Sequence, residues 1–164
     1  TMYIPHYIRT IFSIISIAKN EMITLLKKLN LPKDSYVVLI GASLCARGIR
    51  NSGDIDLLIH PSLRKILLKN GFKEEVISGQ NNVCRRFSQG KIEAFDYFLN
   101  VGFFEEFTRV FSPVEYIEGI PFVSISDIQV IKHRFNREKD KKDLILLEQY
   151  QKQLHVAQLS RVLA

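Results

Sequence analysis

Two aspartates separated by one residue, Asp54 and Asp56, are the clearest sign of chemistry in this sequence. Residues two apart on a β-strand point to the same face, so a strand through this pair places both carboxylates on one side, about 6.6 Å apart along the chain. Carboxylates held so close repel each other unless a cation lies between them. A hard divalent cation such as Mg²⁺, which prefers oxygen ligands and phosphate partners, relieves that repulsion. The pair therefore predicts a magnesium site.

The residues around the pair distinguish it from the solvated strand end that a lone Asp-x-Asp usually marks. Residues 36–40 are strand formers and predict a buried strand. The small residues 41–43 then break this strand. Hydrophobic residues flank both aspartates and predict a second strand that continues to Ile59.

A third carboxylate is expected on a strand over residues 91–98, where Glu93 and Asp96 compete for the role. Because they are three residues apart, they face opposite sides of a regular strand and cannot both join the first two acids. Asp96 lies between Phe95 and Tyr97 and repeats the apolar–acidic–apolar setting of the pair. We favour Asp96 and keep Glu93, which has a longer reach, as the alternate.

The elements that must position these acids predict an α/β (α+β) fold in a single domain, residues 1–164. Its parts are an N-terminal helix over about 9–29, a metal-site core over about 36–98, and a C-terminal hairpin with helices over about 103–164. Within them we expect a helix at 62–70, strands at 72–78 and 83–88, a helix at 103–110, a hairpin at 114–123, a helix beginning at Ser124 and a last helix over about 139–154.

Composition is that of an ordinary globular protein with excess positive charge. The 164 residues can bury a real core, and the formal net charge is +6. This charge favours anionic partners, but it does not choose between a nucleotide and a nucleic acid.

Cysteine, histidine and hydrophobic patterns give no further site. Cys45 and Cys84 lack the CxxC spacing of zinc or redox sites, and the four histidines show no ligand spacing. The apolar run at 11–18 is too short to span a membrane and is followed by no cleavage pattern. We therefore expect reduced thiols and a cytoplasmic protein with no membrane partner.

Two blocks of residues carry a family resemblance. The first is Ile40-Gly41-Ala42-Ser43 followed by Asp54-Ile55-Asp56-Leu57; the second runs through Gly119-Ile120-Pro121, Ser126-Asp127-Ile128, Lys132 and residues 137–144. In this order they resemble the nucleotidyltransferase superfamily with the DNA polymerase beta-like fold. The resemblance is closest to the bacterial branch of antibiotic nucleotidyltransferases and abortive-infection or toxin-type enzymes. Ala42 departs from the pattern, because many members have a second glycine or a serine there.

The resemblance implies a nucleotidyltransferase fold, with a central mixed β-sheet flanked by helices, and an enzyme that uses Mg²⁺ or Mn²⁺. Such an enzyme transfers a nucleoside monophosphate from a nucleoside triphosphate such as ATP to a hydroxyl. Asp54, Asp56 and the third carboxylate would be the metal ligands of an in-line displacement. The third carboxylate would also help to deprotonate the acceptor hydroxyl.

The resemblance also implies which residues bind the triphosphate. A turn at a helix start, where backbone N–H groups approach phosphate, would consist of Gly41, Ala42 and Ser43. Lys132 and Arg137 would neutralise the phosphates. Arg47 and Arg50 lie between the turn and the aspartates and would pair with phosphate or with the two acids. Asp140 and Asp143 are typical of charge pairing at a helix start.

Three functions are compatible with these residues. The first is transfer to a small-molecule hydroxyl, as on an antibiotic. The second is toxin-type transfer to RNA or protein, and the third is nucleotide binding without catalysis. Both acids and the basic block are present, which argues against the third. Because no helical acceptor-binding domain is evident, a homodimer or a partner protein would complete the acceptor site.

Overall fold

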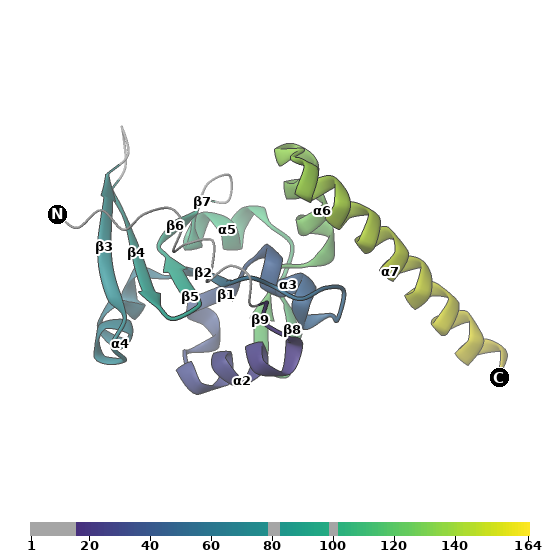
Figure 1. Cartoon of the computed structure of the whole chain (residues 1–164), viewed down its shortest axis with the longest axis horizontal. Helices are drawn as coiled ribbons and strands as arrows, with labels where there is room; N and C mark the ends of the chain where they lie inside the picture. Colours follow the sequence, from purple (N-terminus) through teal and green to yellow (C-terminus); the bar gives the residue numbers. More distant parts are fainter. Residues whose placement is uncertain (1–15, 79–82, 99–101) are drawn as a thin grey trace. The chain divides into compact units, whose positions relative to one another are not determined.

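A seven-stranded mixed sheet organises the part of the chain that ends at Val123, with strand order β3-β4-β5-β2-β1-β9-β8 (Figure 1). The computed structural model describes residues 16–78, 83–98 and 102–164. Its strands are β1 (Tyr36–Val38), β2 (Ile55–Ile59), β3 (Lys73–Ser78), β4 (Val83–Gln89), β5 (Ile92–Phe95), β6 (Tyr97–Phe98), β7 (Gly102–Phe103), β8 (Glu115–Ile117) and β9 (Ile120–Phe122). This confirms a mixed α/β chain with a central mixed sheet.

Strand β2 joins the two halves of this sheet. It pairs antiparallel with β1, where Val38 lies opposite Leu57, and parallel with β5, where Asp56 lies opposite Glu93. Alternate β2 residues, Ile55 and Leu57 among them, are fully buried in the main hydrophobic core. Each such aliphatic side chain contributes on the order of 1.5–3 kcal/mol by leaving water.

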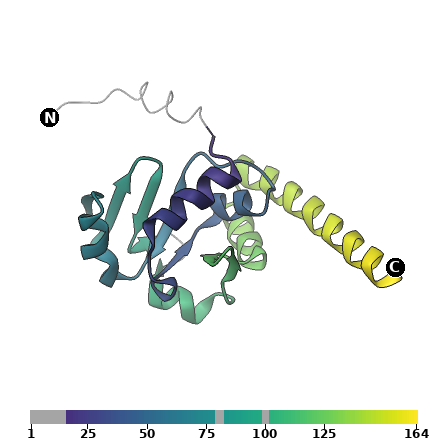
Figure 2. The same cartoon turned by 90° about the horizontal axis from the view of Figure 1, so that it is seen from below.

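Two helices contribute to that core on the same face of the sheet. Helix α2 (Lys19–Leu29) supplies Met22, Ile23 and Leu26, and Figure 2 shows it lying across the strands. Helix α4 (Arg64–Lys69) supplies Leu67 and follows a 3-10 turn at Pro61–Leu63. Apolar residues at spacings of three and four give α2 its buried side, as the sequence predicts.

The N-terminal helix begins later than predicted. Residues 9–15 of the predicted helix lie outside the described residues, and Ile17 forms an isolated antiparallel bridge with Ser52. The backbone N–H of each residue donates to the carbonyl of the other, at 2.6 and 3.1 Å. The side chain of Ile17 is fully buried. Extended pairing and core packing therefore hold this residue outside the helix, which starts at Lys19.

The predicted strand over residues 91–98 is interrupted at Asp96. It consists of β5, a bend at Asp96, and β6, which pairs with β7 in a separate two-stranded sheet. The Arg85 backbone N–H donates to Asp96 Oδ1 at 2.7 Å. The Asp96 carboxylate thus accepts the hydrogen bond that a backbone carbonyl would accept in a regular antiparallel ladder.

Four further α-helices are present in the described residues: α3 (Ile40–Ala46), α5 (Phe104–Val110), and the pair α6 (Ile125–Phe135) and α7 (Glu138–Leu163) near the C-terminus. The α6–α7 pair forms a compact unit of its own, residues 124–164. Ser124 caps α6, since its Oγ accepts from the Asp127 N–H at 3.2 Å. Helix α7 continues to Leu163, which is one of the two outcomes that the sequence leaves open for residues beyond about 154. No helix in the described ranges is long and apolar enough to cross a lipid bilayer.

Candidate active site

The aspartate pair lies on the side of β2 that faces away from the main core. Asp54 immediately precedes the strand, and Asp56 is its second residue. Since Ile55 and Leu57 point into the core, strand alternation directs Asp54 and Asp56 to the opposite face. Asp54 is exposed and Asp56 is half-buried. Both carboxylates can thus be reached from solvent and share one face.

Glu93 is the third carboxylate that the fold brings to this face. It is the direct partner of Asp56 in the parallel pairing of β5 with β2. Neighbouring strands lie about 4.8 Å apart, so the two side chains leave the sheet side by side. Asp96 is 5% exposed and accepts the Arg85 N–H beyond the end of β5. The geometry therefore favours Glu93, the alternate, over Asp96.

The donor chemistry of this face suits a hard cation. Asp54, Asp56 and Glu93 offer only carboxylate oxygens, the ligands that Mg²⁺ takes. In the part of the chain that the structure describes, no three His, Cys, Asp or Glu side chains are gathered closely enough to hold a metal ion. The strand register places Asp56 and Glu93 on the same side of the sheet.

The start of α3 is tied to the strand that carries the acids. Helix α3 begins at Ile40, directly after β1, and its N-cap residue Leu39 donates its N–H to the Asp56 carbonyl at 2.8 Å. The first N–H groups of a helix have no partner within the helix, so they are available to an anion. Among the predicted turn residues, Gly41 and Ala42 lie in this first turn.

Other groups approach Gly41 closely. A Cβ atom on Gly41 would lie 3.2 Å from Ser52 Oγ and 4.0 Å from Arg50 Nη2. Ser52 Oγ in turn donates to the Asp54 carbonyl at 2.7 Å. Arg50 is half-buried and donates from Nη1 to the Asn51 carbonyl. The small-residue turn, Arg50 and the aspartate loop therefore meet in one place.

Ser43 and Arg47 lie in the interior instead. Ser43 is fully buried, its N–H donates to the Leu39 carbonyl, and its Oγ donates to the Val123 carbonyl at 2.8 Å. The Arg47 side chain is 4% exposed; it donates to the Ser43 carbonyl at 2.8 Å and pairs with Glu115. Both side chains thus hold α3 against β8 and β9. The structure directs neither the Ser43 nor the Arg47 side chain toward the aspartate pair or toward a phosphate.

Lys132 and Arg137, also predicted to bind phosphate, belong to an ion cluster within the α6–α7 unit. Lys132 Nζ is 2.7 Å from Asp143 Oδ2 and 3.1 Å from Asp140 Oδ1, and its side chain is 5% exposed. Arg137 Nε donates to Asp140 Oδ2 at 2.6 Å, and its guanidinium lies over the Phe135 ring. The two bases therefore neutralise buried carboxylates of their own unit.

The ionisation of Asp140 shows how strongly this cluster is coupled. Burial raises the pKa of Asp140, but hydrogen bonds from Arg137 and Lys132 outweigh burial and lower the pKa from 3.8 to about 2. The carboxylate is fully buried. A buried charge of this kind is stable only with its partners in place. The pairing predicted at this helix start is thus an interior contact of α6 with α7.

Arg86 on β4 is a residue that sequence reasoning missed. It is the direct strand partner of Glu75 and lies diagonally to Glu93, so all three share the face of the acids. Arg86 pairs with Glu75, and its Nη1 is 3.7 Å from Glu93 Oε1. A basic residue in the middle of a strand gives no local signal, because its partner depends on the register of the sheet.

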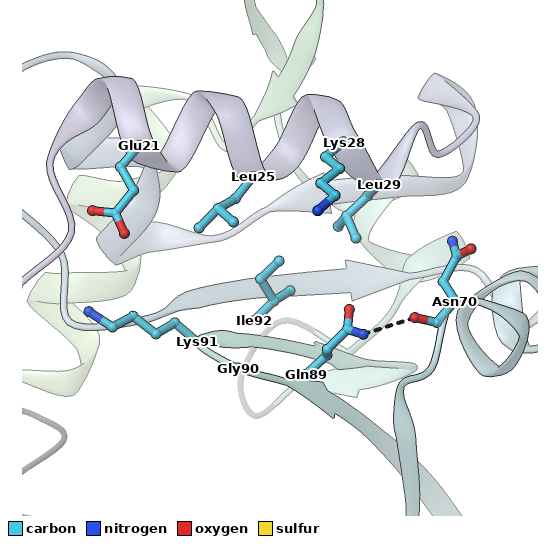
Figure 3. A pocket seen from close by; sticks show the side chains of 9 residues that line it. All are labelled: Glu21, Leu25, Lys28, Leu29, Asn70, Gln89, Gly90, Lys91 and Ile92. Atoms are coloured by element: carbon cyan, nitrogen blue, oxygen red, sulfur yellow. Dashed lines mark hydrogen bonds between the residues drawn. The ribbon is translucent and has the colours of Figure 1, made fainter.

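A cavity of about 600 Å³ lies on the other face of β5, between α2 and the β4–β5 turn (Figure 3). Leu25, Leu29 and Ile92 give it apolar walls, and Lys28 and Lys91 add charge near its two ends. Ile92 faces this cavity, so the adjacent Glu93 faces away from it. The cavity is therefore separate from the carboxylate face.

Cys45 takes no part in this site. Cys45 is buried in α3, and its thiol donates to the Ile17 carbonyl at 3.4 Å. Burial raises the pKa of the Cys45 thiol, which disfavours the nucleophilic thiolate.

No family model matches the chain, and no curated protein or solved structure is significantly similar to it. The assignment of the candidate active site therefore rests on the contacts described above.

Proposed function

We propose that this protein is a Mg²⁺-dependent nucleotidyltransferase that transfers a nucleoside monophosphate from a nucleoside triphosphate to the hydroxyl of a small molecule, such as an antibiotic. The observation that carries the proposal is the pairing of Asp56 with Glu93. Two acids on adjacent parallel strands, joined by Asp54 on the same face, form the carboxylate set that such a reaction needs. In this proposal Glu93 replaces Asp96 as the third acid.

The residues of the chain have separate roles in the proposed reaction. Asp54, Asp56 and Glu93 would hold Mg²⁺, or Mn²⁺ in its place, which stabilises charge on the attacking and leaving oxygens when bound. Glu93, half-buried beside Asp56, would accept the proton of the acceptor hydroxyl as its oxygen bonds to the α-phosphorus and pyrophosphate leaves. The first turn of α3 offers backbone N–H groups at Gly41 and Ala42 to phosphate oxygens.

Arg50 is the base nearest to that turn and is proposed to neutralise the triphosphate. Its Nη2 lies 4.0 Å from the position of a Gly41 Cβ. Lys132 and Arg137 are no part of this proposal, because both are already paired with carboxylates in the α6–α7 unit. The proposal places the protein in the cytoplasm, as a single chain or with a second copy or partner at the acceptor site.

The test is incubation of the metal-free protein with each labelled nucleoside triphosphate, Mg²⁺ and one acceptor class at a time. We expect label on a member of a panel of hydroxylated antibiotics, and none with Asp56→Asn. Asp34→Asn, at an exposed position on a 3-10 turn, is the matched control and should keep full transfer. Label on RNA or on a protein instead would identify the other acceptor classes. Absence of label in all arms would remove the proposal.

A further inference from the structure

Arg86 lies in a row of charged residues on the face of the sheet that carries Asp56 and Glu93. Glu75 on β3 is its direct partner, and Glu93 on β5 is its diagonal neighbour. Asp56 on β2 is the direct partner of Glu93. The four side chains therefore run across four adjacent strands in the order acid, base, acid, acid. The base lies at one end of the carboxylate set proposed to hold the metal.

The contacts of Arg86 are unequal. Its Nη2 donates to Glu75 Oε2, whereas Nη1 is 3.7 Å from Glu93 Oε1, beyond hydrogen-bonding distance. Its Nε is buried and has no hydrogen-bond partner among the described residues. The side chain is 26% exposed. Arg86 is thus anchored by Glu75 and retains donor capacity toward the acids.

Charge balance gives this arrangement a role. Glu93 and Asp56 are like charges on adjacent strands, and a nearby cation offsets the repulsion between them. Arg86 is a cation fixed at that place by the protein itself. A metal ion entering the carboxylate set supplies the same charge, so the metal and the guanidinium compete for Glu93.

We propose that Arg86 is the internal counter-ion of Glu93 and that the Glu75–Arg86 pair sets the affinity of the site for divalent metal. Glu75 acts by holding the guanidinium back from Glu93. Arg86 is accordingly a positioning residue for the metal-binding acid. This inference rests on the proposed function, because it assumes that Asp54, Asp56 and Glu93 bind the metal.

The test is calorimetric titration of the full metal-free chain with Mn²⁺ and with Mg²⁺, without nucleotide. We expect Arg86→Gln to bind metal roughly fivefold more tightly, the factor that corresponds to about 1 kcal/mol for a partly exposed charge pair. Glu75→Gln should bind metal roughly twofold more weakly, because the guanidinium is then released toward Glu93. A loss of folding would change the metal affinity of both variants in the same direction. Opposite changes in metal affinity therefore identify the counter-ion role.

Two controls separate this contact from the general effect of charge. Arg64→Gln and Glu74→Gln remove the same charges from an ion pair on the opposite face of β3, and neither should change metal affinity. In the Glu75→Gln/Arg86→Gln double variant, the weakening caused by Glu75→Gln should disappear.

Several results would overturn the inference. Unchanged or weaker metal binding by Arg86→Gln would remove the counter-ion role while leaving the metal site intact. Weakening that persists in the double variant would show that Glu75 acts without Arg86. If the wild-type chain binds neither metal, the proposed function fails together with this inference.

Discussion

The molecule contains two clusters of charged residues whose carboxylates differ in burial and in pairing. In the α6–α7 unit, Asp140 and Asp143 are buried and paired with Lys132 and Arg137. On the sheet, Asp54 is exposed, and Asp56 and Glu93 are half-buried side by side. The first cluster balances its own charge inside the protein, and the second gathers like charges where solvent reaches them. A buried cluster of this kind builds structure, whereas the accessible acids of the sheet, beside Arg86, are suited to an external cation.

The largest effect is expected when one acid of the sheet cluster is neutralised. We expect Asp56→Asn to reduce nucleotidyl transfer by at least about a thousandfold, since metal ions stabilise the transition state by several kcal/mol. The thermal stabilisation by Mg²⁺ and nucleoside triphosphate, about 2.7 kcal/mol at a ligand concentration of a hundred times Kd, should also vanish. Thermal unfolding with and without ligand measures this. An Asp56→Asn variant that retains the full metal-dependent shift would contradict the assignment.

The opposite cluster should respond in stability. Lys132→Met keeps the aliphatic stem but leaves Asp140 and Asp143 buried without their ammonium partner. We expect a loss of about 3–5 kcal/mol in the free energy of unfolding, measured by urea denaturation. Lys141→Met, which breaks the exposed pair with Glu138, is the control and should cost less than about 1 kcal/mol. Equal losses for both variants would remove the distinction between the clusters.

Glu93 and Asp96 sharpen the comparison within the sheet. Glu93→Gln should lower the rate of transfer by about a hundredfold with little change in stability, as expected for a group that takes up the acceptor proton. Asp96→Ala removes the acceptor of the Arg85 N–H and should cost about 1–3 kcal/mol of stability. Steady-state kinetics and urea denaturation of both variants check this. Slow transfer by Asp96→Asn with normal Glu93→Gln would restore Asp96 as the third acid.

The smallest expected effect is the pH dependence of the buried cluster. Because folding lowers the pKa of Asp140 to about 2, the folded chain binds fewer protons than the unfolded chain at acidic pH. The resulting stabilisation, roughly 2 kcal/mol, is complete above about pH 4 and is lost as the pH falls through 2. Unfolding curves of wild type and Asp140→Asn between pH 2 and 5 should converge toward the acidic end. Curves that stay parallel would show that Asp140 is not the titrating group.

Much of the fold follows from local patterns in the sequence. The alternation around β2 places Ile55 and Leu57 in the core and the two aspartates on the other face, as predicted. The helix start at Ser124 is also as predicted, because a serine three residues before an acid caps a helix locally.

The parts that sequence could not predict depend on contacts between distant residues. The bend at Asp96 comes from a bond to Arg85, and the exit of Ile17 from the predicted helix comes from its bridge to Ser52. The pairing of Asp56 with Glu93 requires the register of β2 against β5, which local periodicity does not contain. For the same reason, the burial of Lys132 by two acids could not be predicted from the positive charge of its helix.

Helix α7 buries Asp140, Asp143 and Leu147 near its start, and every residue from 151 onward is exposed. The segment from residue 151 to Leu163 would be only marginally stable as an isolated helix in water. The free energy gained from its hydrogen bonds scarcely exceeds the cost in conformational entropy of forming the helix. Gln151 still contacts α6, because its Oε1 accepts a hydrogen bond from Gln129 Nε2 at 2.9 Å, whereas the residues beyond it are all exposed. Amide hydrogen exchange should therefore accelerate sharply beyond Gln151, so that one continuous helix contains both slowly and rapidly exchanging halves.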